Sequence, residues 1–317
     1  MLNGRGGVRA STEQTVRQAI DDLDRQRTQV RLTGRTFLVD VVMQAPARFT
    51  TAVRSALEAE LPSMRPAVFR ARFHLRETAS VAEVVALLDG LRRKGSHGVL
   101  LRGPDVPEVA EAAQRLVAAG IPVITLVTDI PGSGRLAYVG IDNRAAGATA
   151  AYLVDQWLGD AHGDVLVTLT RSAFRGEEER EVGFRATLRH RGLVVVPDTE
   201  GLDATMLERV GAALDAHPDV RAVYSIGGGN RAVLDAFGAR ECAVFIAHDL
   251  DEDNVALLRA GRISAVLHHE LGQDMRRACH VIMQAQGALP GGIHSWPSSI
   301  QVVTPHNAPQ PPPPERR

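Results

Sequence analysis

The chain has 317 residues, a length that predicts two ordinary domains or one large domain. Hydrophobic residues make up 44% of it and charged residues 23%, which is typical of a soluble globular protein. A formal net charge of −1 argues against a basic body that clamps nucleic acid, and an aromatic share of 4% argues against a stacking platform for single strands.

The first 35 residues differ from the rest of the chain. Ser11 can cap a helix, and apolar residues recur at helical spacing from there to Leu23. The segment holds seven arginines against four acidic residues. We interpret this excess as a solvated linker, with a segment close to nucleic-acid phosphates as the alternative. Arginine is the default cation throughout, because Lys94 is the only lysine, so a single arginine is weak evidence for a site.

Sequence features also bear on location. The N-terminus lacks the apolar stretch of a secretory signal, and no run approaches the length of a membrane-spanning helix. The two cysteines, Cys242 and Cys279, fit neither a metal cluster nor a disulfide framework. We therefore expect a cytoplasmic protein without membrane contact.

From Thr36 onward, short apolar runs alternate with amphipathic stretches. The runs predict strands buried on both faces, as in a parallel sheet, at 37–43, 98–101, 122–127, 164–169, 222–226, 243–247 and 264–267. The amphipathic stretches predict helices at 49–60, 80–94, 107–119, 144–158, 176–191, 203–216, 228–239, 251–260 and 271–286. This alternation predicts an α/β fold, either as two lobes or as an eight-fold barrel. The proline-rich end, 305–317, is predicted to be disordered.

Polar residues follow nearly every predicted strand. Ligands of open α/β sheets bind beyond the carboxyl ends of the strands, so these residues are candidates for a site. Each of them alone is as easily a helix cap, but their common character predicts a pocket for a polyhydroxylated ligand such as a sugar. The candidates are Gln44, Phe49, Asp142, Asn230, Asp249 and His268.

Other motifs predict no cofactor, no metal and no catalysis. Gly227-Gly228-Gly229 follows a strand, but it matches neither the Walker loop nor the G-x-G-x-x-G pattern that binds phosphate, and we interpret it as a tight turn. His268 and His269 are adjacent, so they point to opposite faces and cannot share a metal ion. The sequence contains neither a G-x-S-x-G elbow nor an H-E-x-x-H motif.

Several short motifs occur in a fixed order along residues 2–304. They are Leu2-Asn3-Gly4 with Val8, Thr12, Val16, Ala19 and Leu23, then Tyr138 to Gly147, Arg180-Glu-Val-Gly183-Phe184, Asn230, and Ala247-His248-Asp249. In order and spacing they resemble the LacI/GalR family, the lactose-repressor type of bacterial transcription regulators.

The resemblance implies a fold and a division into domains. It implies two Rossmann-like lobes with parallel sheets, like type I periplasmic binding proteins, joined by three crossovers with the ligand in the cleft. That favours two lobes over the barrel. The implied parts are a partial headpiece and hinge at 1–35, one lobe at 36–158 plus 269–291, and a second lobe at 159–268 plus 292–304.

The resemblance also implies roles for individual residues. Arg180 becomes a forked donor to hydroxyls or a carboxylate, and Asp249 accepts from two hydroxyls. The side chains of Gln44, Asp142 and Asn230 complete the hydrogen bonding, Phe49 covers an apolar sugar face, and His268 stands where a glutamine is common. Asn3, Arg5 and Arg9 become the weak candidates for DNA contact.

Together these inferences predict a homodimeric DNA-binding regulator whose sugar-like effector changes its affinity for operator DNA. The chain departs from the family in beginning inside the headpiece, without its first two helices, and in lacking the usual hinge pattern between Asp24 and Arg35. The alternatives are a sugar-binding protein for transport, a sugar sensor without DNA binding and, least favoured, an enzyme.

Overall fold

The structure is a computed structural model that describes residues 35–170, 173–197, 199, 203–295 and 297–309. The predicted headpiece, with Asn3, Arg5 and Arg9, lies outside the described residues, and so do residues 310–317 of the predicted tail. Within the described part, no helix combines the length and the apolar character needed to span a membrane.

The first sheet is fully parallel, in the order β2-β1-β3-β4-β5. Its strands are β1 (Thr36–Gln44), β2 (Val68–Arg76), β3 (Gly98–Arg102), β4 (Val123–Leu126) and β5 (Ala137–Val139). β1 is buried along most of its length, because it is rich in apolar residues and has a neighbouring strand on each side.

Asp40 is a buried charge inside β1. Its carboxylate accepts hydrogen bonds from Arg72 (2.8 and 2.6 Å) and lies 2.8 Å from the ring Nε2 of His74, both on β2. Burial raises the pKa of Asp40, but the hydrogen bonds of Arg72, His74 and Ser96 lower it below its usual value. The charge therefore keeps edge strand β2 in register with β1.

The second sheet contains six strands in the order β11-β10-β9-β8-β6-β7. All of its pairs are parallel except that of β11 with β10. The strands are β6 (Asp164–Thr168), β7 (Leu193–Val196), β8 (Val220–Ser225), β9 (Val244–His248), β10 (Ala265–His268) and β11 (Gln301–Val303).

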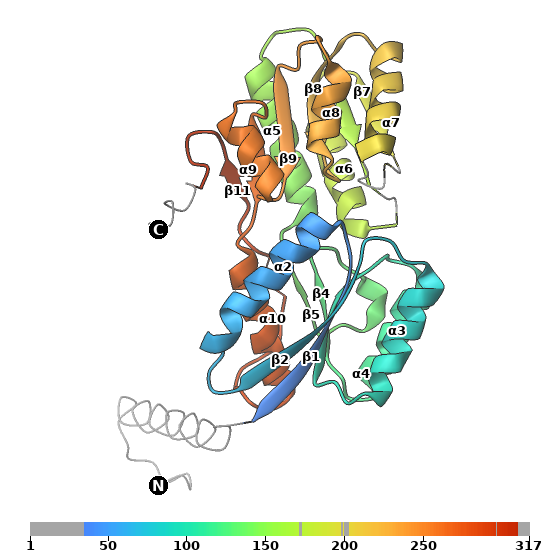
Figure 1. Cartoon of the computed structure of the whole chain (residues 1–317), viewed down its shortest axis with the longest axis vertical. Coiled ribbons are helices and arrows are strands. Elements are labelled where there is room, and N and C mark those ends of the chain that lie inside the picture. Colours follow the sequence, from blue (N-terminus) through green and yellow to red (C-terminus); the bar gives the residue numbers. More distant parts are fainter. Residues whose placement is uncertain (1–34, 171–172, 198, 200–202, 296, 310–317) are drawn as a thin grey trace, which may run out of the picture.

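Helices cover both faces of each sheet (Figure 1). On the first sheet, α2 (Ala47–Glu60) and α10 (Leu271–Ala285) pack on one face, and α3 (Val81–Arg93) and α4 (Pro107–Ala118) on the other. On the second sheet, α5 (Asn143–Leu158) and α6 (Arg175–Thr187) pack opposite three further helices. These are α7 (Asp203–Ala216), α8 (Asn230–Phe237) and α9 (Glu252–Arg259).

The chain passes between the two sheets three times. It crosses from β5 to α5, from β10 back to α10, and from α10 to β11. Two crossings run side by side, because Ile141 forms a bridge with Ser298 and the Ser298 N–H donates to the Gly140 carbonyl at 2.8 Å. Two sheets joined in this way confirm the predicted two-lobed α/β fold and exclude the barrel.

The limits of the lobes remain a proposal. The buried face of α5, including Ala146, Ala150 and Val154, belongs to the apolar cluster of the second sheet. The sequence-based division placed this helix in the first lobe. We propose instead that the second lobe begins close to Asp142, and we use "first lobe" and "second lobe" for the parts built on the two sheets.

Helices α5 and α6 cross at two glycines. A Cβ atom on Gly147 would lie 1.9 Å from the Arg180 carbonyl oxygen, and one on Gly183 would lie 2.0 Å from the Arg144 carbonyl oxygen. Only glycine permits such a close approach of two backbones. This crossing sets the position of Arg180 on α6.

Candidate ligand-binding cleft

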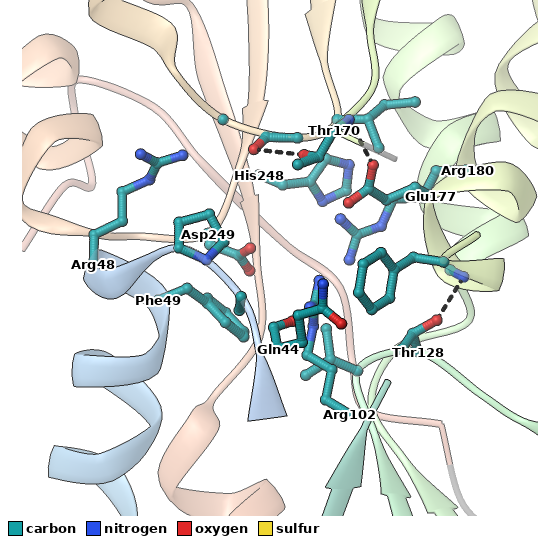
Figure 2. Close-up of a pocket in the computed structure, with 18 of the residues that line it drawn as sticks. Gln44, Arg48, Phe49, Arg102, Thr128, Thr170, Glu177, Arg180, His248 and Asp249 are labelled. Atoms are coloured by element: carbon teal, nitrogen blue, oxygen red, sulfur yellow. Dashed lines mark hydrogen bonds between the residues drawn. The ribbon is translucent and has the colours of Figure 1, made fainter. Parts of the chain in front are cut away.

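A cavity lies between the lobes, at the facing carboxyl ends of the two sets of strands (Figure 2). Its volume is about 820 Å³, part of which is open to solvent. This is the position that ligands take in open α/β sheets. The polar and aromatic side chains that line it are Gln44, Arg48, Phe49, Glu77, Arg102, Thr128, Thr170, Phe174, Glu177, Arg180, His248, Asp249 and Asp251.

Arg102, the last residue of β3, lies between two aromatic rings. Its guanidinium carbon is 4.5 Å from the ring centroid of Phe174 and 5.8 Å from that of Phe49. One terminal nitrogen donates to the Gln44 carbonyl, whereas Nε is buried and has no hydrogen-bond partner among the described residues. Burial lowers the pKa of Arg102, Glu177 and Asp249 oppose that shift, and Arg180 adds to it.

Arg180 enters the cavity from the second lobe. It is 4% exposed, and its Nε donates to Asn143 Oδ1 at 2.8 Å. Asn143 is itself held, because its amide nitrogen donates to the Val127 carbonyl (3.0 Å) and to the Tyr138 hydroxyl (3.1 Å). The guanidinium is therefore fixed at Nε while its two terminal nitrogens face the cavity, as Figure 2 shows.

Asp249 follows β9 with a left-handed backbone, φ +64°. Its N–H donates to the Leu267 carbonyl (3.0 Å), and its own carbonyl accepts from Asn254 Nδ2 (2.7 Å). Such a backbone persists only where its surroundings hold it. The structure thus directs the Asp249 carboxylate to the cavity.

His248 lies beside Asp249 in the wall of the cavity. Its Nε2 is 2.8 Å from the hydroxyl of Tyr224, which stacks on Phe184 with ring centroids 4.6 Å apart. Burial, reinforced by the nearby Arg180 and His269, holds the pKa of His248 well below its usual value. His248 therefore takes part in hydrogen bonds as an uncharged imidazole.

Polar contacts cross the cleft from one lobe to the other. Arg48 Nε lies 3.2 Å from Asp251 Oδ2, the Gly176 N–H donates to Thr128 Oγ1 at 2.8 Å, and the Asp105 N–H donates to the Ala173 carbonyl at 2.9 Å. Arg48 also lies against Gly228, where a Cβ atom would be 2.2 Å from its Nη2. The Gly227–Gly229 segment therefore leaves room for an arginine.

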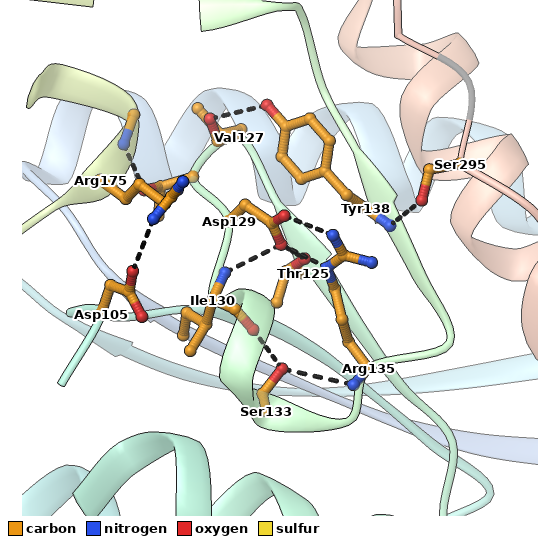
Figure 3. A network of polar contacts seen from close by, with 12 residues as sticks. Asp105, Thr125, Val127, Asp129, Ile130, Ser133, Arg135, Tyr138, Arg175 and Ser295 are labelled. Atoms are coloured by element: carbon orange, nitrogen blue, oxygen red, sulfur yellow. Dashed lines mark hydrogen bonds and ion pairs between the residues drawn. The ribbon is translucent and has the colours of Figure 1, made fainter. Parts of the chain in front are cut away.

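A polar network fixes the loop that carries Thr128 (Figure 3). Asp129 forms an ion pair with Arg135 and accepts from Thr125 Oγ1 (2.7 Å) and the Ile130 N–H (2.8 Å). The loop after β4 thus has its own internal brace. Nearby, Arg175 Nη1 lies 3.5 Å from Asp105 Oδ2 and adds an ion pair between the lobes.

A second buried network lies at the crossovers. His269 Nδ1 lies 2.5 Å from Asp274 Oδ2, and the Ser298 hydroxyl donates to Asp274 Oδ1. The Nε2 of His269 points toward the cleft carboxylate and lies 3.9 Å from Asp249 Oδ1. His269 and Asp274 are each 1% exposed.

The structure brings four of the seven predicted ligand-binding residues to the cavity, namely Gln44, Phe49, Arg180 and Asp249. It does not bring the other three there. Asp142 is an exposed cap of α5 that accepts from the Ala145 N–H (2.9 Å). Asn230 donates to Asn254 Oδ1 (2.6 Å) in a neighbouring pocket, and His268 Nδ1 accepts from the Leu250 N–H (3.3 Å) beside β11. We therefore remove these three from the proposed set.

Sequence reasoning missed several residues of the cavity. Arg102 and Arg48 could not be distinguished from a background of 35 arginines. Phe174 lies just before α6 and Glu177 lies inside it, rather than directly after a strand. A search for polar residues at the ends of strands therefore did not find them. His248 was treated only as a neighbour of Asp249, although both line the cavity.

The sequence matches the periplasmic binding protein domain over residues 41–288, which is most of the chain and both lobes. The chain belongs to this family. Its fold resembles GanP, a glucose-galactose binding protein from Geobacillus stearothermophilus, with a TM-score of 0.76 and 19% identity over 87% of this chain and 99% of that one.

Two further solved structures share the fold. One is an ABC transporter solute-binding protein from Burkholderia graminis C4D1M in complex with D-arabinose (TM-score 0.76, 22% identity, 86% of this chain and 96% of that one). Another is a carbohydrate transporter from Acidothermus cellulolyticus 11B in complex with myo-inositol (TM-score 0.73, 19% identity, 87% and 96%). At these identities the likeness concerns the fold.

One curated relative matches over a short segment. A phosphate acetyltransferase from Paracoccus denitrificans is 44% identical over 63 residues, 19% of this chain. The match spans 18% of that enzyme, far less than its full length, and carries no activity over to this chain. The family and the matched structures are those of binding proteins rather than enzymes.

These findings correct the predicted function and location. The prediction of a DNA-binding transcriptional regulator is wrong, because the family is that of periplasmic binding proteins and the matched structures are a glucose-galactose binding protein, a transporter solute-binding protein and a carbohydrate transporter. The predicted cytoplasmic location is wrong for the same reason, since this family points to the periplasm or the cell exterior. Operator DNA and a homodimer receive no support from the matches. Apart from those between Leu2 and Leu23, the motifs that suggested a regulator lie within the matched residues 41–288, so they could not separate the two classes.

Proposed function

We propose that the chain is a solute-binding protein of a transport system, and that it captures a sugar or sugar-like molecule outside the cytoplasm. The observation that carries this proposal is the cavity between the lobes. Fixed hydrogen-bonding groups line it, and aromatic rings reach it from both lobes, Phe49 from α2 and Phe174 from the start of α6.

The walls suit a polyhydroxylated ligand. The Asp249 carboxylate is an acceptor, and its left-handed backbone directs it to the cavity. Arg180 presents two terminal nitrogens as donors, and Thr170 and Gln44 also line the cavity. Apolar walls with a few placed polar groups are typical of small-molecule sites, and phenylalanine rings provide the flat surface that a sugar ring can cover. The relation to proteins solved with D-arabinose and myo-inositol supports the same assignment.

Calorimetric titration and thermal melting of the purified protein test the proposal. The panel contains D-arabinose, D-galactose, D-glucose, myo-inositol, D-galacturonate and D-gluconate. We expect at least one of them to bind and to raise the melting temperature, because a ligand at about 100 times its Kd stabilises the folded state by about 2.7 kcal/mol. If no compound binds, the proposal is wrong.

A pair of matched variants locates the binding. Asp249→Asn removes the acceptor charge from the cavity and should weaken binding at least about tenfold, about 1.4 kcal/mol. Asp142→Asn makes the same change at an exposed position outside the cavity, where asparagine caps a helix as well as aspartate does. Equal losses in the two variants would contradict a site in this cleft.

A further inference from the structure

Two of the arginines that line the cleft have no acidic partner within ion-pair distance among the described residues. No carboxylate oxygen of a described residue lies within 4.0 Å of a nitrogen of Arg102 or Arg180. Arg48, by contrast, is paired with Asp251 at 3.2 Å. Burying a cation without a counter-ion is costly, because it loses the solvation that water provides.

The two unpaired cations come from opposite lobes and are close enough to interact. Arg102 ends β3 in the first lobe, and Arg180 lies on α6 in the second. Burial has the largest effect and lowers the pKa of Arg102. The positive charge of Arg180 adds to this lowering, and the carboxylates of Glu177 and Asp249, which lie beyond ion-pair distance, oppose it. An anion placed between them would relieve both the repulsion and the loss of solvation.

Both guanidiniums also have donors to spare. Nε of Arg102 is buried without a hydrogen-bond partner, and the terminal nitrogens of Arg180 donate to no described residue. A carboxylate can accept two parallel hydrogen bonds from a guanidinium, so it fits such donors better than a single hydroxyl does.

Acidic residues also line the cleft, but most of them have other roles. Asp251 pairs with Arg48, Glu177 accepts from the Thr170 N–H at 2.8 Å, and Glu77 accepts from the Ala47 N–H at 3.1 Å at the start of α2. The carboxylate of Asp249 accepts no hydrogen bond from a described residue, which leaves it to receive ligand hydroxyls.

We propose that the solute is a sugar acid, a hydroxylated monocarboxylate whose carboxylate lies between Arg102 and Arg180 and whose hydroxyls reach Asp249. This inference rests on the proposed function, because it names the class of solute that the same cleft captures. An anion held from both lobes also favours the closed arrangement.

Calorimetry with two matched pairs of compounds tests the proposal. D-galacturonate is compared with D-galactose, and D-gluconate with D-glucose, at pH 7.5 and at low and high salt. Within at least one pair, the acid should bind at least about tenfold more tightly than the neutral sugar, and this preference should shrink at high salt.

Three arginine variants then locate the preference. Arg102→Gln and Arg180→Gln should each reduce the preference for the acid to about twofold or less, while Arg54→Gln, at an arginine that pairs with Glu58 and does not line the cavity, keeps it. Thermal melting checks that each variant folds. If Arg180→Gln does not fold, Arg102→Gln decides the question.

The experiments distinguish a failure of this inference from a failure of the proposed function. Neutral sugars that bind as tightly as the acids, or more tightly, would overturn the inference and leave the proposed function standing. A preference for the acid that survives both Arg102→Gln and Arg180→Gln would overturn the placement of the carboxylate. If none of the four compounds binds, this inference is wrong, and if D-arabinose and myo-inositol fail as well, the proposed function falls with it.

Discussion

The two walls of the cleft are held in different ways. On the second-lobe wall, polar groups bond within their own lobe: His248 to Tyr224, the Asp249 carbonyl to Asn254, and the Thr170 hydroxyl to the Gly227 carbonyl (3.0 Å). On the first-lobe wall, Arg48 and Thr128 bond across the gap, and Arg102 stacks on the ring of Phe174. These three bonds of the second wall do not depend on the first lobe, although Asn143, which holds Arg180, also donates to Val127 and Tyr138 of the first lobe. The contacts that Arg48, Thr128 and Arg102 make with the second lobe, by contrast, form only when the lobes meet.

The largest expected effect comes from a change at the crossing of α5 and α6, which positions Arg180 in the second wall. Gly147→Ala should destabilise the protein by about 3 kcal/mol, because the new Cβ would meet the backbone oxygen of Arg180 rather than a side chain that can move. It should also weaken ligand binding, since it displaces the helix that carries Arg180. Urea unfolding measures the stability, and calorimetry measures the binding.

Gly211→Ala is the matched control. Gly211 lies in the middle of α7, and a Cβ atom there would have no neighbour within 4 Å. The change should stabilise the protein by about 0.5–1 kcal/mol, because alanine loses less chain entropy in a helix than glycine. If Gly147→Ala were as stable as this control, the tight crossing would not support the second wall.

The next largest effect is a dependence of folding stability on pH, which arises from His248 in the same wall. Its folded pKa lies well below 6.5, so the unfolded chain binds more protons below about pH 6.5. Stability should therefore fall as the pH is lowered from about 6.5 toward the folded pKa, by up to about 1.4 kcal/mol per pH unit. Thermal melting between pH 7.5 and 5 measures this slope.

His248→Gln should flatten the slope while still offering the Tyr224 hydroxyl a partner. The slope should shrink rather than vanish, because burial also lowers the pKa values of His268 and His280. The exposed His306→Gln serves as the control and should leave the slope attributable to His248 in place. An unchanged slope in His248→Gln would argue against a buried, neutral imidazole in this wall.

The smallest effect concerns the first wall. Arg48→Gln removes one ion pair that crosses the cleft, so the open arrangement should become more populated and the radius of gyration in small-angle scattering should increase. The stability should change by less than about 1 kcal/mol, because both partners keep some contact with solvent. Arg54→Gln, on the same helix, removes a pair with Glu58 away from the cleft and should leave the scattering unchanged.

Much of the fold could be predicted from the sequence. Each of the nine predicted helices corresponds to one of α2 to α10, because every one has an apolar face at helical spacing. Strands β2, β7 and β11 were missed. The sequence of β2, VFRARFHLR, alternates polar and apolar residues instead of forming a continuous run. Its place at the sheet edge explains the alternation, and that place is known only from the pairing.

The site was harder to predict, because a polar residue after a strand has two possible roles. Asp249 comes directly after β9 and faces the cleft, whereas Asp142, a few residues after β5, caps a helix. The left-handed backbone of Asp249 also separates them, and it depends on bonds to distant residues. Arg102 shows the same limit, because its stacking partner Phe174 belongs to the other lobe.

The buried Asp274 network has a consequence for how the protein moves. It binds His269 from the crossing after β10 and Ser298 from the crossing before β11, and Ser298 pairs with Ile141 of the crossing before α5. The three crossover segments are thus joined to one another at one place, and we expect them to bend together. We therefore expect the lobes to move about this one point, so that each closure brings the same side chains of the two walls together.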